Sequence, residues 1–242
     1  MSMSKPMPEP GREPPLADKR RNEVLRRSLS VGVATGAYAT SFGALSVASG
    51  LDLWQTVALS ALLFTGGSQF ALVGIIASGG SGAAAVATST LLGARNGLYG
   101  LQMSRLLGVS GWSRLAAAQL TIDESTAVGV AQPERSAQRL GFWTTGLAVF
   151  AFWNILTIAG AVLGNALGDP KVFGLDAVAP AAFCGLLWPR LKSGETRAVA
   201  VVSAAIALVV APHAPAGIPV LLAAVAAIVA GLLPPRDGPA AP

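Results

Sequence analysis

The sequence predicts an all-α, polytopic integral membrane helix bundle with about seven or eight hydrophobic segments, some of them broken or re-entrant. Hydrophobic residues make up 52% of the 242 residues and charged residues only 12%, and the mean hydropathy is +0.59. This composition is typical of membrane proteins. A helix needs about 20 apolar residues to cross the hydrocarbon, so the hydrophobic region holds these segments and leaves no room for a separate soluble domain.

The chain divides into three parts by composition. Residues 1–27 are expected to form a disordered, basic cytoplasmic tail, residues 28–233 the transmembrane domain, and residues 234–242 a disordered C-terminal tail. The first tail is rich in Pro and charge, as disordered segments are. The positive-inside rule places the N-terminus in the cytoplasm, because basic residues gather just before the first apolar segment: Lys19, Arg20, Arg21, Arg26 and Arg27.

Turn residues rich in Gly and Pro separate the expected membrane segments. These segments are 28–49, 54–78, 83–107, 116–132, 141–165, 173–189, 197–212 and 216–233. Basic residues fall in the inner loops except at 105–114, where Arg105 and Arg114 would lie outside. The third segment is also interrupted by glycines around Arg95, and the fourth is short and polar. We therefore expect the third and fourth segments to be discontinuous or partly re-entrant.

A second glycine cluster lies within segment 54–78. Gly66 and Gly67 are followed by Ser68 and Gln69. Two adjacent glycines weaken a helix, and the segment could unwind here and offer Ser68 and Gln69 to a polar substrate. The alternative is close packing, with Gln69 hydrogen-bonded between helices.

Three charged residues lie inside apolar stretches, namely Arg95, Asp123 and Glu124. An ionised group at bilayer depth costs at least about 2.5–3.5 kcal/mol, so such groups tend to be paired and functional. The planar guanidinium of Arg95 suits a carboxylate, and an acid suits an ammonium group, so the set can bind a zwitterionic amino acid. The other candidates are Asn96, beside Arg95, and Thr121, on the same helical face as Glu124.

Two further interpretations of these charges remain open. Arg95 and the acids can instead form a structural ion pair, or lie at the interface with their charges reaching water. Adjacent Asp123 and Glu124 diverge by about 100° on a helix, so one can face a cavity while the other bonds a structural partner. A buried carboxylate can also carry a proton.

Several function classes are excluded by missing motifs. The sequence has no phosphate-binding GxxxxGK[ST] loop, and its one histidine, His213, and one cysteine, Cys184, provide no metal site. No cofactor is expected. Nucleic-acid binding is not expected either, because the net charge of +5 is explained by membrane topology.

Three stretches together resemble the AzlC-type branched-chain amino acid permeases, the large subunits of two-component LIV-E exporters. They are LLFTGGSQFALVGIIASGG (62–80), LLGARNGLYGLQMSRLLG (91–108) and LTIDESTAV (120–128), and the resemblance spans most of residues 28–233. Asn96 follows Arg95 where His is more often found in the family. The stretch LDAVAPAAFCGLLWPRL (175–191) also looks like the opening of the small AzlD-type subunit.

The resemblance implies a multi-pass permease of the bacterial inner membrane rather than an enzyme. It implies export of branched-chain or similar hydrophobic amino acids, driven by the proton gradient and assisted by an AzlD-type subunit. The site residues that we select from the sequence are Arg95, Asp123, Glu124, Gln69, Asn96, Ser68 and Thr121.

Rival classes make different predictions. A non-transporting membrane scaffold subunit would tolerate loss of Arg95, and a channel would give single-channel currents. An intramembrane hydrolase needs two facing carboxylates, whereas Asp123 and Glu124 are adjacent in sequence and point apart.

Overall fold

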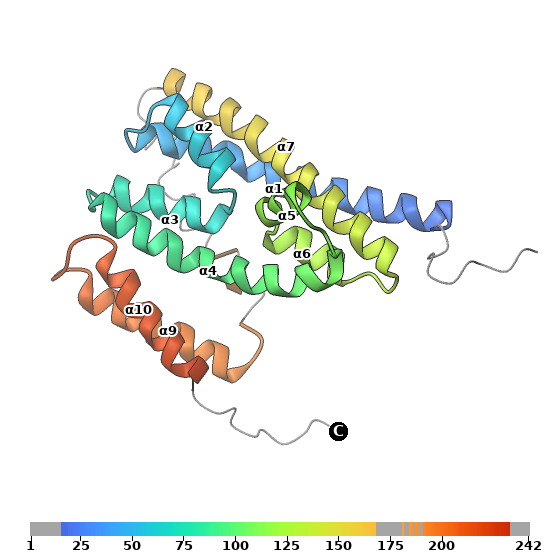
Figure 1. Cartoon of the computed structure of the whole chain (residues 1–242). Helices are drawn as coiled ribbons and strands as arrows, with labels where there is room; N and C mark the ends of the chain where they lie inside the picture. The colour runs from blue at the N-terminus through green and yellow to red at the C-terminus, as the bar shows by residue number, and fades with distance from the viewer. Residues whose placement is uncertain (1–15, 168–180, 182–183, 186, 189–190, 233–242) are drawn as a thin grey trace, which may run out of the picture.

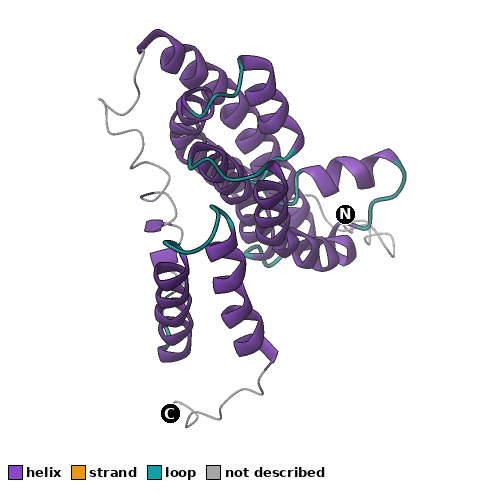
Figure 2. Ribbon diagram, turned by 90° about the vertical axis from the view of Figure 1, so that its left-hand side faces the viewer, coloured by secondary structure: helices purple, strands orange, loops and turns teal. Residues whose placement is uncertain are grey.

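The computed structural model describes residues 16–167, 181, 184–185, 187–188 and 191–232. This part of the chain is helical and contains no strand (Figures 1 and 2), which confirms the predicted all-α class. The helices are α1 (Asp18–Ala48), α2 (Leu53–Leu62), α3 (Gly66–Ala77), α4 (Gly82–Leu107), α5 (Trp112–Gln119), α6 (Asp123–Val130), α7 (Arg135–Leu167), α9 (Gly194–Val210) and α10 (Ile218–Leu232). The expected tail 234–242 and most of the expected segment 173–189 lie outside the described residues.

The first helix begins earlier than predicted. Residues 18–27 belong to α1, so the expected disordered tail 1–27 is wrong over its last part, while residues 1–15 lie outside the described residues. Arg, Lys and Glu have high helix propensity. These charged residues therefore extend α1 beyond its apolar part, which packs against the bundle.

Helices α1 and α7 run in the same direction and pack along most of their length (Figure 1). Glycines make this contact possible, since a Cβ at Gly36 would lie 2.6 Å from Cβ of Phe152, and one at Gly164 would lie 2.8 Å from a methyl of Val47. Small residues let membrane helices approach closely. By length and composition, α1 and α7 are the two described helices that can cross a membrane. Helix α4 is long as well, at 26 residues, but is more polar.

The second expected segment, 54–78, folds back on itself. Helix α2 ends at Leu62 and α3 begins at Gly66. The amide Nε2 of Gln69 donates to the carbonyl oxygens of Leu59 (3.1 Å) and Ser60 (3.2 Å), residues that a continuous helix would separate by about 13 Å. Helices α2 and α3 therefore form a hairpin that turns back inside the bundle, which we call re-entrant, with its tip at the glycines.

A second re-entrant hairpin consists of α5 and α6. The guanidinium of Arg139, at the start of α7, donates to the carbonyl oxygen of Leu107, the last residue of α4 (2.5 Å). The chain between them therefore leaves one end of the bundle and returns to it. Its two half-helices are separated by residues 120–122, which confirms that the fourth expected segment is discontinuous.

The third expected segment is not broken. Helix α4 is continuous from Gly82 to Leu107, so the predicted interruption near Arg95 is wrong, and the interruption lies in the second segment instead. A glycine costs a helix only up to about 1 kcal/mol, which packing of α4 against α3 outweighs.

The two hairpins belong to an internal repeat. With an offset of 57 residues, α1, α2 and α3 correspond to α4, α5 and α6, and GAYATSFG (36–43) aligns with GARNGLYG (93–100). The repeats meet near their equivalent tips, where Nε2 of Gln119 lies 3.5 Å from the carbonyl oxygen of its counterpart Leu62. Because α1 and α4 run in opposite directions (Figure 1), the repeats are inverted, as in many transporters.

The fold explains why the 105–114 loop is basic although the predicted topology placed it outside. Because the α2–α3 hairpin does not cross the bundle, α4 runs back to the end at which α1 begins. Arg20 of α1 bonds Gln132 (2.8 Å), and Arg135 of α7 bonds the carbonyl oxygen of Arg105 (3.1 Å). We call this the basic end of the bundle, and it also carries Arg114 at the start of α5.

Helices α9 and α10 form a separate hairpin beside α4 (Figures 1 and 2). Ser203 of α9 donates to the carbonyl oxygen of Ala223 of α10 (3.1 Å). Before α10, Gly217 lies against Ala84 of α4. This hairpin lies outside the repeat and away from its central core.

Candidate functional site

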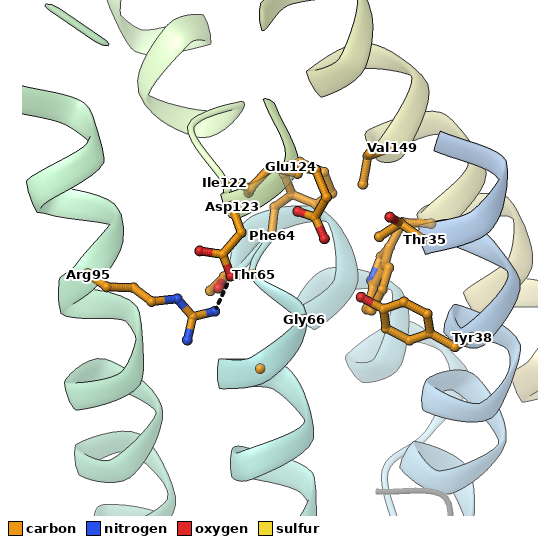
Figure 3. A pocket seen from close by; sticks show the side chains of 12 residues that line it. Thr35, Tyr38, Phe64, Thr65, Gly66, Arg95, Ile122, Asp123, Glu124 and Val149 are labelled. Carbon is orange, nitrogen blue, oxygen red and sulfur yellow. Dashed lines mark ion pairs between the residues drawn. The ribbon is translucent and has the colours of Figure 1, made fainter. Parts of the chain in front are cut away.

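The tips of the two re-entrant hairpins meet in the middle of the bundle, where a pocket lies between α1, α3, α4, α6 and α7 (Figure 3). It is lined by Thr35, Tyr38, Phe64, Thr65, Gly66, Gly67, Arg95, Ile122, Asp123, Glu124, Val149 and Trp153. The N-termini of α3 and α6 both point at this pocket. Each has backbone N–H groups without a helical partner and a partial positive charge, so the tips favour anionic groups.

Arg95 and Asp123 form an ion pair across the pocket, with Nη2 of Arg95 3.1 Å from Oδ2 of Asp123 (Figure 3). The two side chains are 29% and 23% exposed, so water screens the pair only partly. Asp123 lies in the first turn of α6, where the helix dipole stabilises a carboxylate. Arg95 reaches the first turn of α3, and a Cβ at Gly67 would lie 3.3 Å from its Nη2. The glycine thus makes room for the guanidinium.

Glu124 lines the same pocket from a different direction. Asp123 points toward Arg95 on α4, whereas Glu124 points toward the side of α1 that carries Thr35 and Tyr38 (Figure 3). The two adjacent carboxylates therefore diverge, as the helical spacing predicts. The pocket consequently has a cationic group on its α4 side and an acidic group near its α1 side.

Four other residues selected from the sequence lie beside the pocket rather than on its wall. Gln69 holds the α2–α3 hairpin together, and Oγ1 of Thr121 donates to the carbonyl oxygen of Ala117 (2.7 Å). Oγ of Ser68 and Oδ1 of Asn96 are buried polar atoms with no hydrogen bond in the described part of the chain. The structure thus brings Arg95, with Asp123 and Glu124, into one pocket and gives Gln69 and Thr121 structural hydrogen bonds.

Several pocket residues are missed by sequence reasoning, among them two aromatic ones. Tyr38 and Trp153 pack edge to face, with ring centroids 5.1 Å apart. Trp153 lies near the middle of α7 and is 2% exposed. The repeat carries a signal for Tyr38, since it occupies in α1 the position that Arg95 occupies in α4.

The pocket is nearly closed in this structure. Its free volume is about 20 Å³, which is room for about one water molecule, whereas sites for small molecules measure about 300–1,000 Å³. Any amino acid therefore requires an opening movement to bind. Within the described residues, no group of three or more His, Cys, Asp or Glu side chains could hold a metal ion.

Comparison with known families identifies a match. A family model described as AzlC protein matches residues 30–167, which is more than half of the chain and covers the repeat and α7. Comparisons with curated proteins and with solved structures give no match.

Proposed function

The chain belongs to the AzlC protein family, and we propose on this basis that it is a secondary transporter exporting branched-chain or similar hydrophobic amino acids across the bacterial inner membrane. Family membership supports a membrane protein with a transport role for amino acids and no enzymatic activity. The observation that carries the finer proposal is the Arg95–Asp123 ion pair in mid-bundle, where two inverted hairpins meet. Partly buried charges at such a point are typical of transport sites.

The pocket offers a separate partner for each pole of an amino acid. Arg95 and the first-turn N–H groups of α3 suit the carboxylate, by charge and by the helix dipole. Glu124 suits the ammonium group, and the aromatic rings of Tyr38 and Trp153 lie in the same pocket wall, where a cation–π contact can form after the pocket opens. Apolar side chains complete the wall, namely Phe64, Ile122 and Val149. They suit an aliphatic side chain.

The charge distribution supports an orientation of the chain in the membrane. The positive-inside rule favours a cytoplasmic location for the basic end of the bundle, and therefore for the N-terminus of this multi-pass chain. Glu124 lines the pocket on the side away from Arg95 (Figure 3), and we propose that it carries the coupling proton.

A small hydrophobic subunit of the AzlD type completes the proposal. Helices α9 and α10 present many exposed apolar side chains, among them Val201, Leu208 and Leu232. Lipid covers such faces in a membrane, and a second hydrophobic chain can do so equally well. Efflux that requires both chains, and their co-purification, would support this part of the proposal.

The test is efflux of preloaded labelled leucine, isoleucine and valine from cells that express the chain with and without its subunit. We expect efflux that an uncoupler abolishes and that Arg95→Ala eliminates while the protein still inserts. Arg105→Ala is the matched control, because Arg105 lies on the same helix with an exposed side chain outside the pocket. Normal efflux by Arg95→Ala would favour the scaffold alternative instead.

A further inference from the structure

A groove between α4 and α6 extends from the first turn of α6 toward the basic end of the bundle. Its volume is about 490 Å³, and Asp123 and Glu124 line both this groove and the pocket. Farther out, its walls include Gln102 of α4 and Val130 of α6. Both lie within two turns of the helix ends that face the basic end. The groove therefore shares Asp123 and Glu124 with the proposed site, and these two residues lie at its inner end, in the first turn of α6.

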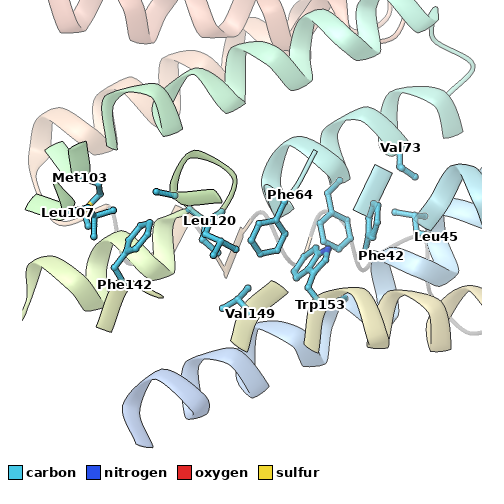
Figure 4. Packing of buried hydrophobic residues seen from close by; sticks show 14 residues of the cluster. Phe42, Leu45, Phe64, Val73, Met103, Leu107, Leu120, Phe142, Val149 and Trp153 are labelled. Carbon is cyan, nitrogen blue, oxygen red and sulfur yellow. The ribbon is translucent and has the colours of Figure 1, made fainter. Parts of the chain in front are cut away.

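The inverted repeat identifies the equivalent route on the other side, between α1 and α3. The counterparts of Gln102, Ala127 and Val130 are Leu45, Phe70 and Val73. Leu45 is 8% exposed, Phe70 1% and Val73 0%, and all three belong to the central hydrophobic core (Figure 4). In place of a groove, this half of the repeat has a packed apolar layer.

Aromatic rings close the α1–α3 route. Phe42 and Phe70 pack edge to face with centroids 5.5 Å apart, and Phe42 also lies 6.1 Å from Trp153 in the pocket wall. The α4–α6 half lacks this ring pair because Ala127 stands where α3 carries Phe70. Ala127 in place of Phe70, together with Gln102 in place of Leu45, thus accompanies an open groove in one half and a packed layer in the other.

We infer that the α4–α6 groove is the aqueous route by which a zwitterionic amino acid reaches the pocket from the basic end, and that the Phe42–Phe70 contact is the seal toward the opposite end. The inference rests on the proposed transport function for its occupant, whereas the accessibility of the route can be measured without transport. The polar side chains Tyr99 and Gln102 along the groove, and the acidic residues at its inner end, favour water over a lipid chain, because unsolvated polar and charged groups in hydrocarbon are costly.

Cysteine labelling tests the route directly. Cys184 is the single cysteine of the chain, so the Cys184→Ser variant has no thiol that the reagent can label and serves as the background for each new cysteine. In inside-out vesicles, a charged, membrane-impermeant thiol reagent should label Gln102→Cys and Val130→Cys. Their repeat counterparts, Leu45→Cys and Val73→Cys, should react at least about tenfold more slowly from either side, because a minor state is typically populated to about 10% or less.

Filling the groove provides the second test. Ala127→Phe introduces into α6 the ring that α3 carries at Phe70, and it should suppress labelling of Gln102→Cys and also amino acid efflux. Ala131→Phe is the matched control, because Ala131 is exposed at the end of α6 and does not line the groove. Membrane insertion and vesicle orientation are checked by labelling of Ser110→Cys, which lies in an exposed loop.

The outcomes separate the inference from the function on which it rests. If the charged reagent labels neither groove position while Ser110→Cys reacts, lipid or another chain fills the groove, and the inference is overturned. Equal labelling rates at the groove positions and at their counterparts would contradict the role of the Phe42–Phe70 contact as a seal. Labelling as expected in a protein that exports no amino acid would support the route and remove the proposed substrate.

Discussion

Tyr38 and Arg95 occupy equivalent positions in the two inverted repeats and line the same pocket from opposite sides. Arg95 pairs with Asp123 at 3.1 Å, whereas Tyr38 packs against Trp153 on the side toward which Glu124 points (Figure 3). A symmetric scaffold thus presents a cation on one wall and an aromatic hydroxyl with an acid on the other. This asymmetry matches a substrate whose own two poles differ.

The hydroxyl of Tyr38 is expected to contribute to substrate affinity. Tyr38→Phe keeps the ring against Trp153 and removes one hydrogen-bonding group, which is worth about 0.5–1.5 kcal/mol. We expect KM for efflux from proteoliposomes to rise by about 2- to 10-fold with the amount of protein unchanged. Tyr38→Ala should lose more, because it also removes the ring packing. Equal KM values for Tyr38→Phe and the parent protein would argue against a role for the hydroxyl.

Neutralising Glu124 should uncouple transport from protons. Glu124→Gln cannot carry a proton but keeps the shape of the pocket wall, so amino acid exchange should persist while net proton-driven efflux is lost. Counterflow of labelled leucine in proteoliposomes measures the first activity, and efflux under an imposed pH gradient measures the second. Asp123→Asn is the comparison variant: because it removes the partner of Arg95, it should impair both activities. Retention of gradient-driven efflux by Glu124→Gln would assign the proton to another group.

The Arg95–Asp123 pair should also contribute to stability. Asp123→Ala leaves a partly buried guanidinium without its carboxylate, which costs about 1–3 kcal/mol. The double variant Arg95→Ala/Asp123→Ala removes both charges and should be less destabilised than the two single losses added together. Thermal unfolding in detergent measures the stability of the parent protein, the two single variants and the double variant, which together form a double-mutant cycle. Strict additivity would mean that the two charges do not interact.

Sequence reasoning identifies the chemistry of the site better than the path of the chain. Arg95, Asp123 and Glu124 stand out because charge in an apolar stretch is costly, and the structure gathers them in one pocket. Gly66 and Gly67 indicate a possible break in segment 54–78, but its fold-back into a hairpin is missed because an apolar segment of this length satisfies the criterion for a crossing, whether or not it folds back. Its signature is tertiary, namely the hydrogen bonds that Gln69 makes to α2.

The same glycine pattern has different consequences in α1 and α4, which sequence alone does not distinguish. A Cβ at Gly43 would overlap the carbonyl oxygen of Thr157 on α7, whereas one at its counterpart Gly100 would meet nothing within 4 Å. Gly43→Ala should therefore destabilise the protein by about 1–3 kcal/mol, the usual cost of overpacking. Gly100→Ala should be neutral or stabilise α4 by up to about 1 kcal/mol. Thermal unfolding compares the two, and equal effects would contradict the close α1–α7 contact.

The re-entrant hairpins and eight full crossings predict opposite topologies for two loops. In this structure α4 returns to the basic end, so Ser110 lies on the same side as the N-terminus and Ser78 on the other side. If segments 54–78 and 83–107 both crossed fully, the two loops would exchange sides. Ser110→Cys and Ser78→Cys, each in the Cys184→Ser background, are exposed positions suited to an impermeant thiol reagent. In intact cells we expect labelling at Ser78→Cys alone, and in inside-out vesicles at Ser110→Cys alone. The reverse pattern would rule out the α2–α3 hairpin, and with it the inverted repeat that places Arg95 opposite Tyr38.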